Sequence, residues 1–326
     1  MTREPRDHGG NLDAAMRRHG GDAAHWIDLS TGINPVPYPV PDLGARAFTA
    51  LPTQTDMDAL RAVAAACYAT RAHVTPLAGA QAAIQAVPHL AGTGVARVLV
   101  PTYNEHAAAL RACGWTVEEV DTLQALNGAD CAVVVNPNNP DGARHDPKRL
   151  MALAGQVGLL VVDESFADPD PDLSLAPLLH DASDNVIVLR SFGKFYGLAG
   201  LRLGFVLSGA GVAARLDALA GPWPVSGPAI EVGRQALGDR DWHRQTCARL
   251  ARDAARLDAV AAGAGWSLVG GTPLFRTYAT PDATAAQEHL ARHHIWSRVF
   301  PWSRHWLRLG LAGPPEHWDR IRAALG

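Results

Sequence analysis

Three short stretches of the chain are apolar without interruption, at residues 131–135, 159–162 and 186–189. Runs of this length fit strands that are covered on both faces, as in parallel α/β sheets. Further strands are expected at 97–100 and 203–207, and helical periodicity appears at 56–70 and 149–157. The pattern therefore predicts an α/β fold with a mostly parallel sheet flanked by helices.

A proline- and glycine-rich segment at residues 221–228 interrupts this alternation and predicts a domain junction. Beyond it, residues 229–262 are helical in pattern, and strands are expected at 266–269, 274–278 and 306–311, which suits a smaller α+β domain. The first 40 residues are rich in Gly, Asn and Pro, with one short strand at 26–29. We expect an N-terminal arm, a large domain and a small C-terminal domain, at residues 1–40, 41–222 and 223–326.

Composition and charge exclude several classes of function. The net charge is −3 and no run of like charges occurs, so the sequence predicts no nucleic-acid partner. No apolar span is long enough for a transmembrane helix, the N-terminus does not resemble a signal peptide, and the four cysteines form no CxxC pair. We expect a cytoplasmic protein without a metal site, because His289 and His293 have a metal-like spacing but no third ligand.

Polar residues follow the three apolar runs, where the predicted strands end. Asn139 follows the first run, Asp163 the second and Lys194 the third. Ligands of open α/β sheets bind outside the carboxyl ends of the strands, so these residues are candidates for one pocket. The spacing permits such a pocket without requiring it.

Lys194 is one of only two lysines in the chain, the other being Lys148, although lysine and arginine together number 29. Arginine carries generic positive charge elsewhere, which suggests that a retained lysine performs chemistry that guanidinium cannot, such as Schiff-base formation. A codon bias toward arginine is the alternative, and it suffices for Lys148, which lies in a polar stretch.

Together these residues resemble the fold type I pyridoxal-phosphate (PLP) enzymes, in the branch of the histidinol-phosphate aminotransferases. The resemblance covers nearly the whole chain and implies a seven-stranded sheet in the large domain. It implies that Lys194 forms the Schiff base with the cofactor, that Asp163 pairs with the ring nitrogen and that Asn139 binds the phenolic oxygen. Tyr103 is expected to stack on the ring. The alternatives are a helix cap or turn for Asp163, a turn for Asn139 and core packing for Tyr103.

The same resemblance assigns the cofactor phosphate to three segments. Gly79-Ala80-Gln81 matches the turn before a helix, where backbone amides bind anions, and Ser191 and Arg202 match the remaining phosphate ligands.

The N-terminus resembles one family within this group, the L-threonine-O-3-phosphate decarboxylases of cobalamin biosynthesis. The matching residues are His8, Gly9 and Gly32, together with Arg298 and Arg308. The resemblance implies that these residues and Asn139 bind a small phosphorylated amino acid. Two arginines suit a substrate with a carboxylate and a phosphate, but the sequence does not say which arginine binds which group. The implied product is (R)-1-amino-2-propanol O-2-phosphate.

Some positions depart from the family pattern. Asp141 stands where threonine is usual, Phe166 where aminotransferases often have tyrosine, and Gly32 where asparagine is common. The family is expected to form homodimers, yet Leu51 stands where a tyrosine usually reaches the partner's cofactor. Two alternatives stay open: an aminotransferase acting on histidinol phosphate or a related phosphorylated amine, and a PLP-binding protein without catalysis.

Overall fold

The computed structural model describes residues 8–326, and the chain divides into two compact units. The larger unit consists of Pro37–Asn139 and Ala143–Arg244. The smaller unit consists of the described residues up to Val36 together with Pro140–Gly142 and Gln245–Gly326. The chain therefore passes between the units at residues 36–37, 139–143 and 244–245.

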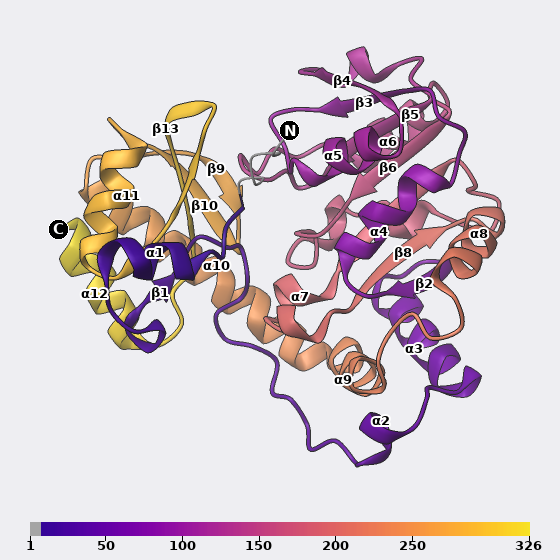
Figure 1. Ribbon diagram of the computed structural model, residues 1–326, viewed down its shortest axis with the longest axis horizontal. Coiled ribbons are helices and arrows are strands. Elements are labelled where there is room, and N and C mark those ends of the chain that lie inside the picture. Colours follow the sequence, from indigo (N-terminus) through magenta and orange to yellow (C-terminus); the bar gives the residue numbers. More distant parts are fainter. Residues whose placement is uncertain (1–7) are drawn as a thin grey trace. The chain divides into compact units, whose positions relative to one another are not determined.

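The larger unit contains a seven-stranded sheet in the order β2-β8-β7-β6-β5-β3-β4 (Figure 1). Strands β7, β6, β5, β3 and β4 pair in parallel, whereas β8 is antiparallel to both of its neighbours. This arrangement confirms the predicted mostly parallel seven-stranded sheet. The strands are β2 (His73–Leu77), β3 (Val95–Leu99), β4 (Thr116–Val120), β5 (Cys131–Val135), β6 (Leu159–Asp163), β7 (Val186–Ser191) and β8 (Gly204–Ser208).

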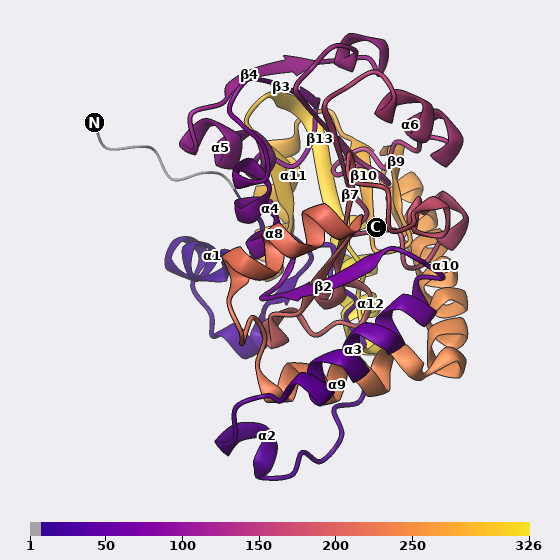
Figure 2. The ribbon, with the colours of Figure 1, turned by 90° about the vertical axis from the view of Figure 1, so that its right-hand side faces the viewer.

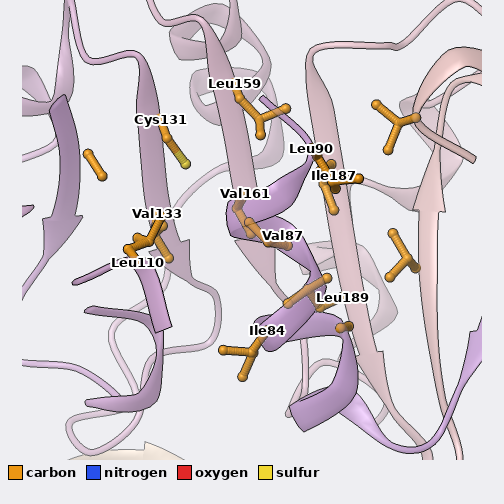
Figure 3. Close-up of a cluster of buried hydrophobic side chains, with 14 of the residues drawn as sticks. Ile84, Val87, Leu90, Leu110, Cys131, Val133, Leu159, Val161, Ile187 and Leu189 are labelled. Carbon is orange, nitrogen blue, oxygen red and sulfur yellow. The ribbon is translucent and has the colours of Figure 1, made fainter. Parts of the chain in front are cut away.

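Both faces of the central strands are buried, which explains their uninterrupted apolar sequences. On one face, Val133, Val161 and Leu189 pack against helical side chains such as Ile84 and Leu110 (Figure 3). Residues of the other parity, including Val134, Leu160 and Val162, are also buried. The central strands therefore have no polar face, as parallel sheets in α/β proteins require.

Helices of the larger unit connect and cover these strands. Helix α3 begins with a capping box, in which Thr53 and Asp56 each satisfy a backbone N–H of the other. It packs beside α9 (Figure 2). The helices are α2 (Arg46–Thr49), α3 (Gln54–Cys67), α4 (Ala80–Ala86), α5 (Glu105–Ala112), α6 (Pro147–Ala154), α7 (Phe192–Phe195), α8 (Ala210–Ala220) and α9 (Gly227–Gly238), with short 3-10 turns at Val87–His89, Gln124–Leu126, Pro171–Leu173, Ala176–Leu178 and Ala199–Leu201.

The smaller unit contains a four-stranded antiparallel sheet, in the order β12-β13-β10-β9. A second, two-stranded sheet joins the N-terminal segment to the C-terminal region, because Ile27 pairs in parallel with Ile295. The elements are α1 (Leu12–His19), a 3-10 turn (Ala23–His25), β1 (Ile27–Asp28), β9 (Ser267–Thr272), β10 (Phe275–Ala279), α11 (Ala283–Arg292), β11 (Ile295–Trp296), β12 (Arg298–Phe300), β13 (Ser303–Gly310) and α12 (Pro315–Leu325).

The division into units differs from the boundaries predicted at residues 40 and 222. Residues 229–262 are helical as predicted and form two helices, because α9 ends before Asp239 and α10 runs over Arg240–Gly263. Helix α9 belongs to the larger unit because it packs on α3. The described part of the arm belongs with the C-terminal region through the β1–β11 pairing. No helix within residues 8–326 is long and apolar enough to cross a membrane.

Candidate functional site

Three neighbouring strands of the larger unit end in predicted site residues. Asp163 is the last residue of β6 and Ser191 the last of β7, while Asn139 follows β5 by a short loop. Strands β5, β6 and β7 are adjacent and parallel, so their carboxyl ends share one edge of the sheet. The expected meeting of these strand ends is therefore found in the structure.

Asp163 is buried and fully hydrogen-bonded. Its Oδ2 lies 2.8 Å from Nε2 of His106, and its Oδ1 accepts hydrogen bonds from the backbone N–H and the hydroxyl of Ser165 at 2.9 and 2.5 Å. Burial alone would raise the pKa of Asp163, but His106 and Ser165 together hold it below its ordinary value. The carboxylate therefore stays ionised.

His106 contacts the candidate site residue Asp163 and was not predicted from the sequence. It lies on the first turn of α5, three positions after Tyr103, and is 3% exposed. The rings of Tyr103 and His106 are 6.3 Å apart. Its position three residues after Tyr103, the predicted stacking residue, could have indicated that His106 lies near the site. No local pattern identifies the distant Asp163 as the partner of His106.

Lys194 lies on α7, a single turn of helix that follows β7 directly. The side chain is half-buried, with Nζ 5.9 Å from the centre of the Phe166 ring. Aromatic residues of the same turn fix its backbone, since Phe192 and Tyr196 stack with ring centres 4.3 Å apart. The amine is thus carried on a rigid turn beside the strand ends.

A hydrogen-bond chain joins Tyr103 to the start of α4. The Tyr103 hydroxyl donates to Oε1 of Gln81 at 3.4 Å, and Nε2 of Gln81 donates to Glu105 at 2.9 Å. The predicted stacking residue and one predicted phosphate residue therefore contact each other directly.

The Gly79-Ala80 turn and Arg202 also lie together. Gly79 has φ +83°, and a Cβ built on it would lie 2.7 Å from Nη2 of Arg202. Gly204, the strand neighbour of Ser191, approaches the same turn, because its Cβ would lie 2.6 Å from the amide nitrogen of Ala80. The positive φ of Gly79 favours glycine at this turn, against which the guanidinium of Arg202 lies.

Asn139 is half-buried and lies in a loop whose base is held by side-chain amides. Asn138 accepts a hydrogen bond from the Thr102 hydroxyl at 2.6 Å and donates to the carbonyl of Pro101 at 2.8 Å. Asn136 donates to the carbonyls of His145 and Leu173. The apparent turn motif therefore builds a rigid loop.

The smaller unit carries the predicted substrate arginines. Arg298 and Arg308 are direct partners across the antiparallel β12–β13 pair. Arg308 is buried, and its Nη2 donates to the carbonyl of Ser30 at 2.6 Å. As direct cross-strand partners, the two arginine side chains lie on the same face of the sheet.

The described start of the N-terminal segment packs on the same region. The amide of Gly10 donates to the Ser30 hydroxyl at 2.7 Å, and a Cβ on Gly9 would collide with the carbonyl oxygen of Ser30. His8 is exposed and Gly32 is buried. Ser30 thus contacts both the His8-Gly9 segment and Arg308.

The residues of the larger unit fit PLP chemically. They supply a primary amine at Lys194, an ionised buried carboxylate at Asp163, an aromatic ring at Tyr103 and a guanidinium at Arg202 against a glycine turn. Each suits one part of the cofactor: the aldehyde, the ring nitrogen, the ring face and the phosphate.

Comparison with known proteins identifies the family. Residues 26–325 match the family model for aminotransferase class I and II. The chain is 42% identical to a threonine-phosphate decarboxylase from Sinorhizobium sp., over 96% of this chain and 95% of that protein. It is also 42% identical to a threonine-phosphate decarboxylase from Pseudomonas aeruginosa, over 98% and 97%.

A solved structure supports the fold. The histidinol-phosphate aminotransferase from Sinorhizobium meliloti, in complex with pyridoxal-5'-phosphate, superposes with a TM-score of 0.78 at 22% identity, covering 96% of this chain and 92% of that one. The fold type I architecture predicted from the sequence is thereby confirmed, and the chain belongs to the aminotransferase class I and II family.

Proposed function

We propose that this protein is a PLP-dependent carboxy-lyase that converts L-threonine O-3-phosphate to (R)-1-amino-2-propanol O-2-phosphate for cobalamin biosynthesis. The structural observation that carries the proposal is the pairing of Arg298 with Arg308 across β12–β13. The 42% identity to two threonine-phosphate decarboxylases, over nearly the whole chain, supports the same reaction.

The cofactor is held by the larger unit. Bound PLP supplies an electron-withdrawing ring that accepts the electron pair left on Cα when a substituent departs. Asp163 holds the proton on the ring nitrogen, because its carboxylate stays ionised beside His106. Tyr103 covers the ring and Asn139 binds the phenolic oxygen. The phosphate is bound by Gly79, Ala80, Gln81, Ser191 and Arg202.

The substrate is held by the smaller unit. Arg298 and Arg308 bind its carboxylate and its phosphate, since planar guanidinium groups pair with both anions in a bidentate manner. Phenylalanine rings flank both cations, with Phe300 5.5 Å from Arg298 and Phe275 5.3 Å from Arg308. These aromatic faces attract the guanidinium cations. His8, Gly9, Gly32 and Asn139 complete the substrate contacts.

The orientation of the substrate determines the reaction. When the Cα–carboxylate bond is the one that breaks, carbon dioxide leaves and Cα keeps its hydrogen. The amine of Lys194 then delivers one proton to Cα, which balances the reaction. By binding the carboxylate and the phosphate, the two arginines hold the substrate in the orientation in which the Cα–carboxylate bond breaks.

An aminotransferase is the second candidate, because Lys194 and Asp163 serve transamination equally well. A histidinol-phosphate aminotransferase has the same fold, so the fold accommodates this reaction too. In that reaction the Cα hydrogen leaves instead of the carboxylate, and a keto acid is required to complete the cycle.

Carbon dioxide release tests the proposal. Purified protein reconstituted with PLP should release carbon dioxide from L-threonine O-3-phosphate without any keto acid, and Lys194→Ala should abolish the release. Amino transfer from histidinol phosphate to 2-oxoglutarate, without carbon dioxide release, would assign the protein to the aminotransferases. Binding of PLP with neither reaction would indicate a non-catalytic protein.

We also propose that the protein is a cytoplasmic homodimer. Two large apolar side chains near α2, Phe48 and Leu51, are 68% and 62% exposed, as expected for a surface that a second copy covers. Light scattering with size-exclusion chromatography should give twice the chain mass of 34.6 kDa.

A further inference from the structure

The segment Pro140–Gly142 belongs to the smaller unit, although the residues on both sides of it belong to the larger one. It is held there by close backbone contacts. A Cβ built on Gly142 would collide with the carbonyl oxygen of Gly271, and one built on Gly270 would collide with that of Asp141. Gly142 has φ +70°, which also favours glycine. Side chains at these positions would push the segment away from β9.

One side-chain hydrogen bond anchors the same segment to β10. The hydroxyl of Thr277 donates to the carbonyl of Pro140 at 2.5 Å, and Thr277 is fully buried. The peptide bond of Pro140 joins it directly to Asn139. The base of the loop is closed independently in the larger unit, where the Asn138 amide donates to the carbonyl of Ala143 at 2.8 Å.

Thr277 has a second neighbour, which is the substrate strand. It is the direct partner of Arg308 in the β10–β13 register, and Arg308 is in turn the partner of Arg298. Within the smaller unit, Thr277 therefore lies beside Arg308 and bonds to Pro140, the residue that follows Asn139 in the chain.

We propose that Thr277 is a positioning residue that fixes the conformation of the Pro140–Gly142 segment and, through the peptide bond between Asn139 and Pro140, the conformation of Asn139. The inference rests on the proposed function, because Asn139, Arg298 and Arg308 take their roles from it. The Thr277 hydroxyl holds the tip of the loop while Asn138 holds its base, and Asn139 lies between the two anchors. Displacement of a positioned group by about 1 Å can reduce turnover by about a hundredfold.

Three variants test this role. Thr277→Val keeps the shape of the side chain and removes the hydroxyl, while Thr277→Ser keeps the hydroxyl. Thr280→Val is the matched control, because the buried Thr280 hydroxyl also donates to a backbone carbonyl in the same unit, that of His305 at 3.2 Å. That carbonyl lies outside the Pro140–Gly142 segment.

The first readout is amide hydrogen exchange of the cofactor-free protein. Thr277→Val should accelerate exchange at residues 138–143, while Thr280→Val should leave those residues unchanged.

The second readout is the pH at which the visible absorbance of bound PLP changes. Loss of the Asn139 donor should move this midpoint upward, because a hydrogen bond to the phenolic oxygen stabilises its anionic form. The third is turnover, which Thr277→Val should lower by about ten- to a hundredfold at saturating substrate.

Thr277→Ser should restore all three readouts nearly to wild type. The proposal is overturned if Thr277→Val matches Thr280→Val in exchange and in the absorbance midpoint, or if Thr277→Ser behaves like Thr277→Val. If Thr277→Val does not fold, a folded Thr277→Ser with wild-type exchange and midpoint supports the proposal, and one with altered values contradicts it. Exchange and absorbance need no substrate, so failure of the decarboxylase assignment would appear separately, as absent carbon dioxide release.

Discussion

Asp163 and Glu164 are neighbours in the chain and are both buried, yet their surroundings differ. The carboxylate of Asp163 contacts His106 and Ser165, on the side of the sheet edge where Tyr103 lies. Glu164 accepts hydrogen bonds from Arg190 at 2.8 Å, from the Ser174 hydroxyl and from the Leu175 amide. One carboxylate belongs to the candidate site and the other to the internal framework.

The pKa values of the two groups shift in opposite directions. Burial raises the pKa of Glu164, and the hydrogen bonds and the Arg190 charge offset this only in part. Burial also opposes ionisation of Asp163, but there the His106 and Ser165 contacts prevail and the pKa falls. Burial of a carboxylate therefore does not identify a functional group, and the partners of its oxygens decide its role.

The largest effect should come from removing the shared cation of the framework. Arg190 forms ion pairs with both Glu164 and Asp168, each at 2.8 Å. Arg190→Met therefore leaves two buried carboxylates without their positively charged partner. We expect the free energy of unfolding to fall by about 3–5 kcal/mol. Urea denaturation of the cofactor-free protein measures this. The folded fraction of Arg190→Met should have a turnover within a few-fold of wild type. If Arg190→Met were as stable as wild type but inactive, Arg190 would belong to the site.

Asp163→Asn should lower turnover strongly and stability only a little, the reverse of what is expected for Arg190→Met. The amide cannot hold the ring-nitrogen proton, and we expect turnover to fall by about a hundred- to a thousandfold. Stability should change less than in Arg190→Met, because the amide oxygen of the variant side chain can still accept hydrogen bonds. Single-turnover carbon dioxide release and urea denaturation together check this. Turnover within threefold of wild type would remove Asp163 from the mechanism.

A smaller effect is expected at His106, which acts through Asp163. His106→Phe keeps a ring but removes the hydrogen bond, and we expect about a ten- to hundredfold loss of turnover, as for other residues that orient a functional group. His106→Gln retains a donor and should recover part of the loss. Higher activity in His106→Phe than in His106→Gln would show that ring packing, rather than the hydrogen bond, is what matters.

The smallest effect should appear in the pH dependence of stability. Because the pKa of folded Asp163 lies below the unfolded value, ionised Asp163 stabilises the fold above the unfolded pKa. This contribution is lost as the pH falls through the folded pKa, below about pH 4. The difference in unfolding free energy between wild type and Asp163→Asn should therefore be constant above about pH 5 and shrink as the pH falls below about 4. A difference that stays constant over the whole pH range would contradict the lowered pKa.

The central strands could be predicted because their environment imposes a simple local pattern. Residues 131–135 and 159–163 are apolar up to the closing aspartate because both faces are covered, and the structure has strands there. Strand β4 was not predicted, because it lies at the sheet edge and alternates with polar residues. The break between α9 and α10 was also missed, since Asp239 interrupts a stretch that is otherwise helical in composition.

Long-range contacts were the least predictable part. The pairing of Ile27 with Ile295 and the hydrogen bond between His106 and Asp163 join segments that no local pattern relates. The resemblance supplied Lys194, Asp163 and the arginines as candidates, because their order along the chain is specific. It did not supply Thr277, whose role depends on a register that only the folded sheet reveals.

The fate of the Cα hydrogen tests the central claim most directly. L-threonine O-3-phosphate carrying deuterium at Cα should be incubated with the PLP-loaded protein, and the product examined by mass spectrometry alongside carbon dioxide release. Decarboxylation predicts an aminopropanol phosphate that retains the deuterium, with one carbon dioxide released per product. Loss of the deuterium to solvent, with a keto acid and no carbon dioxide, would contradict the account and assign the protein to transamination.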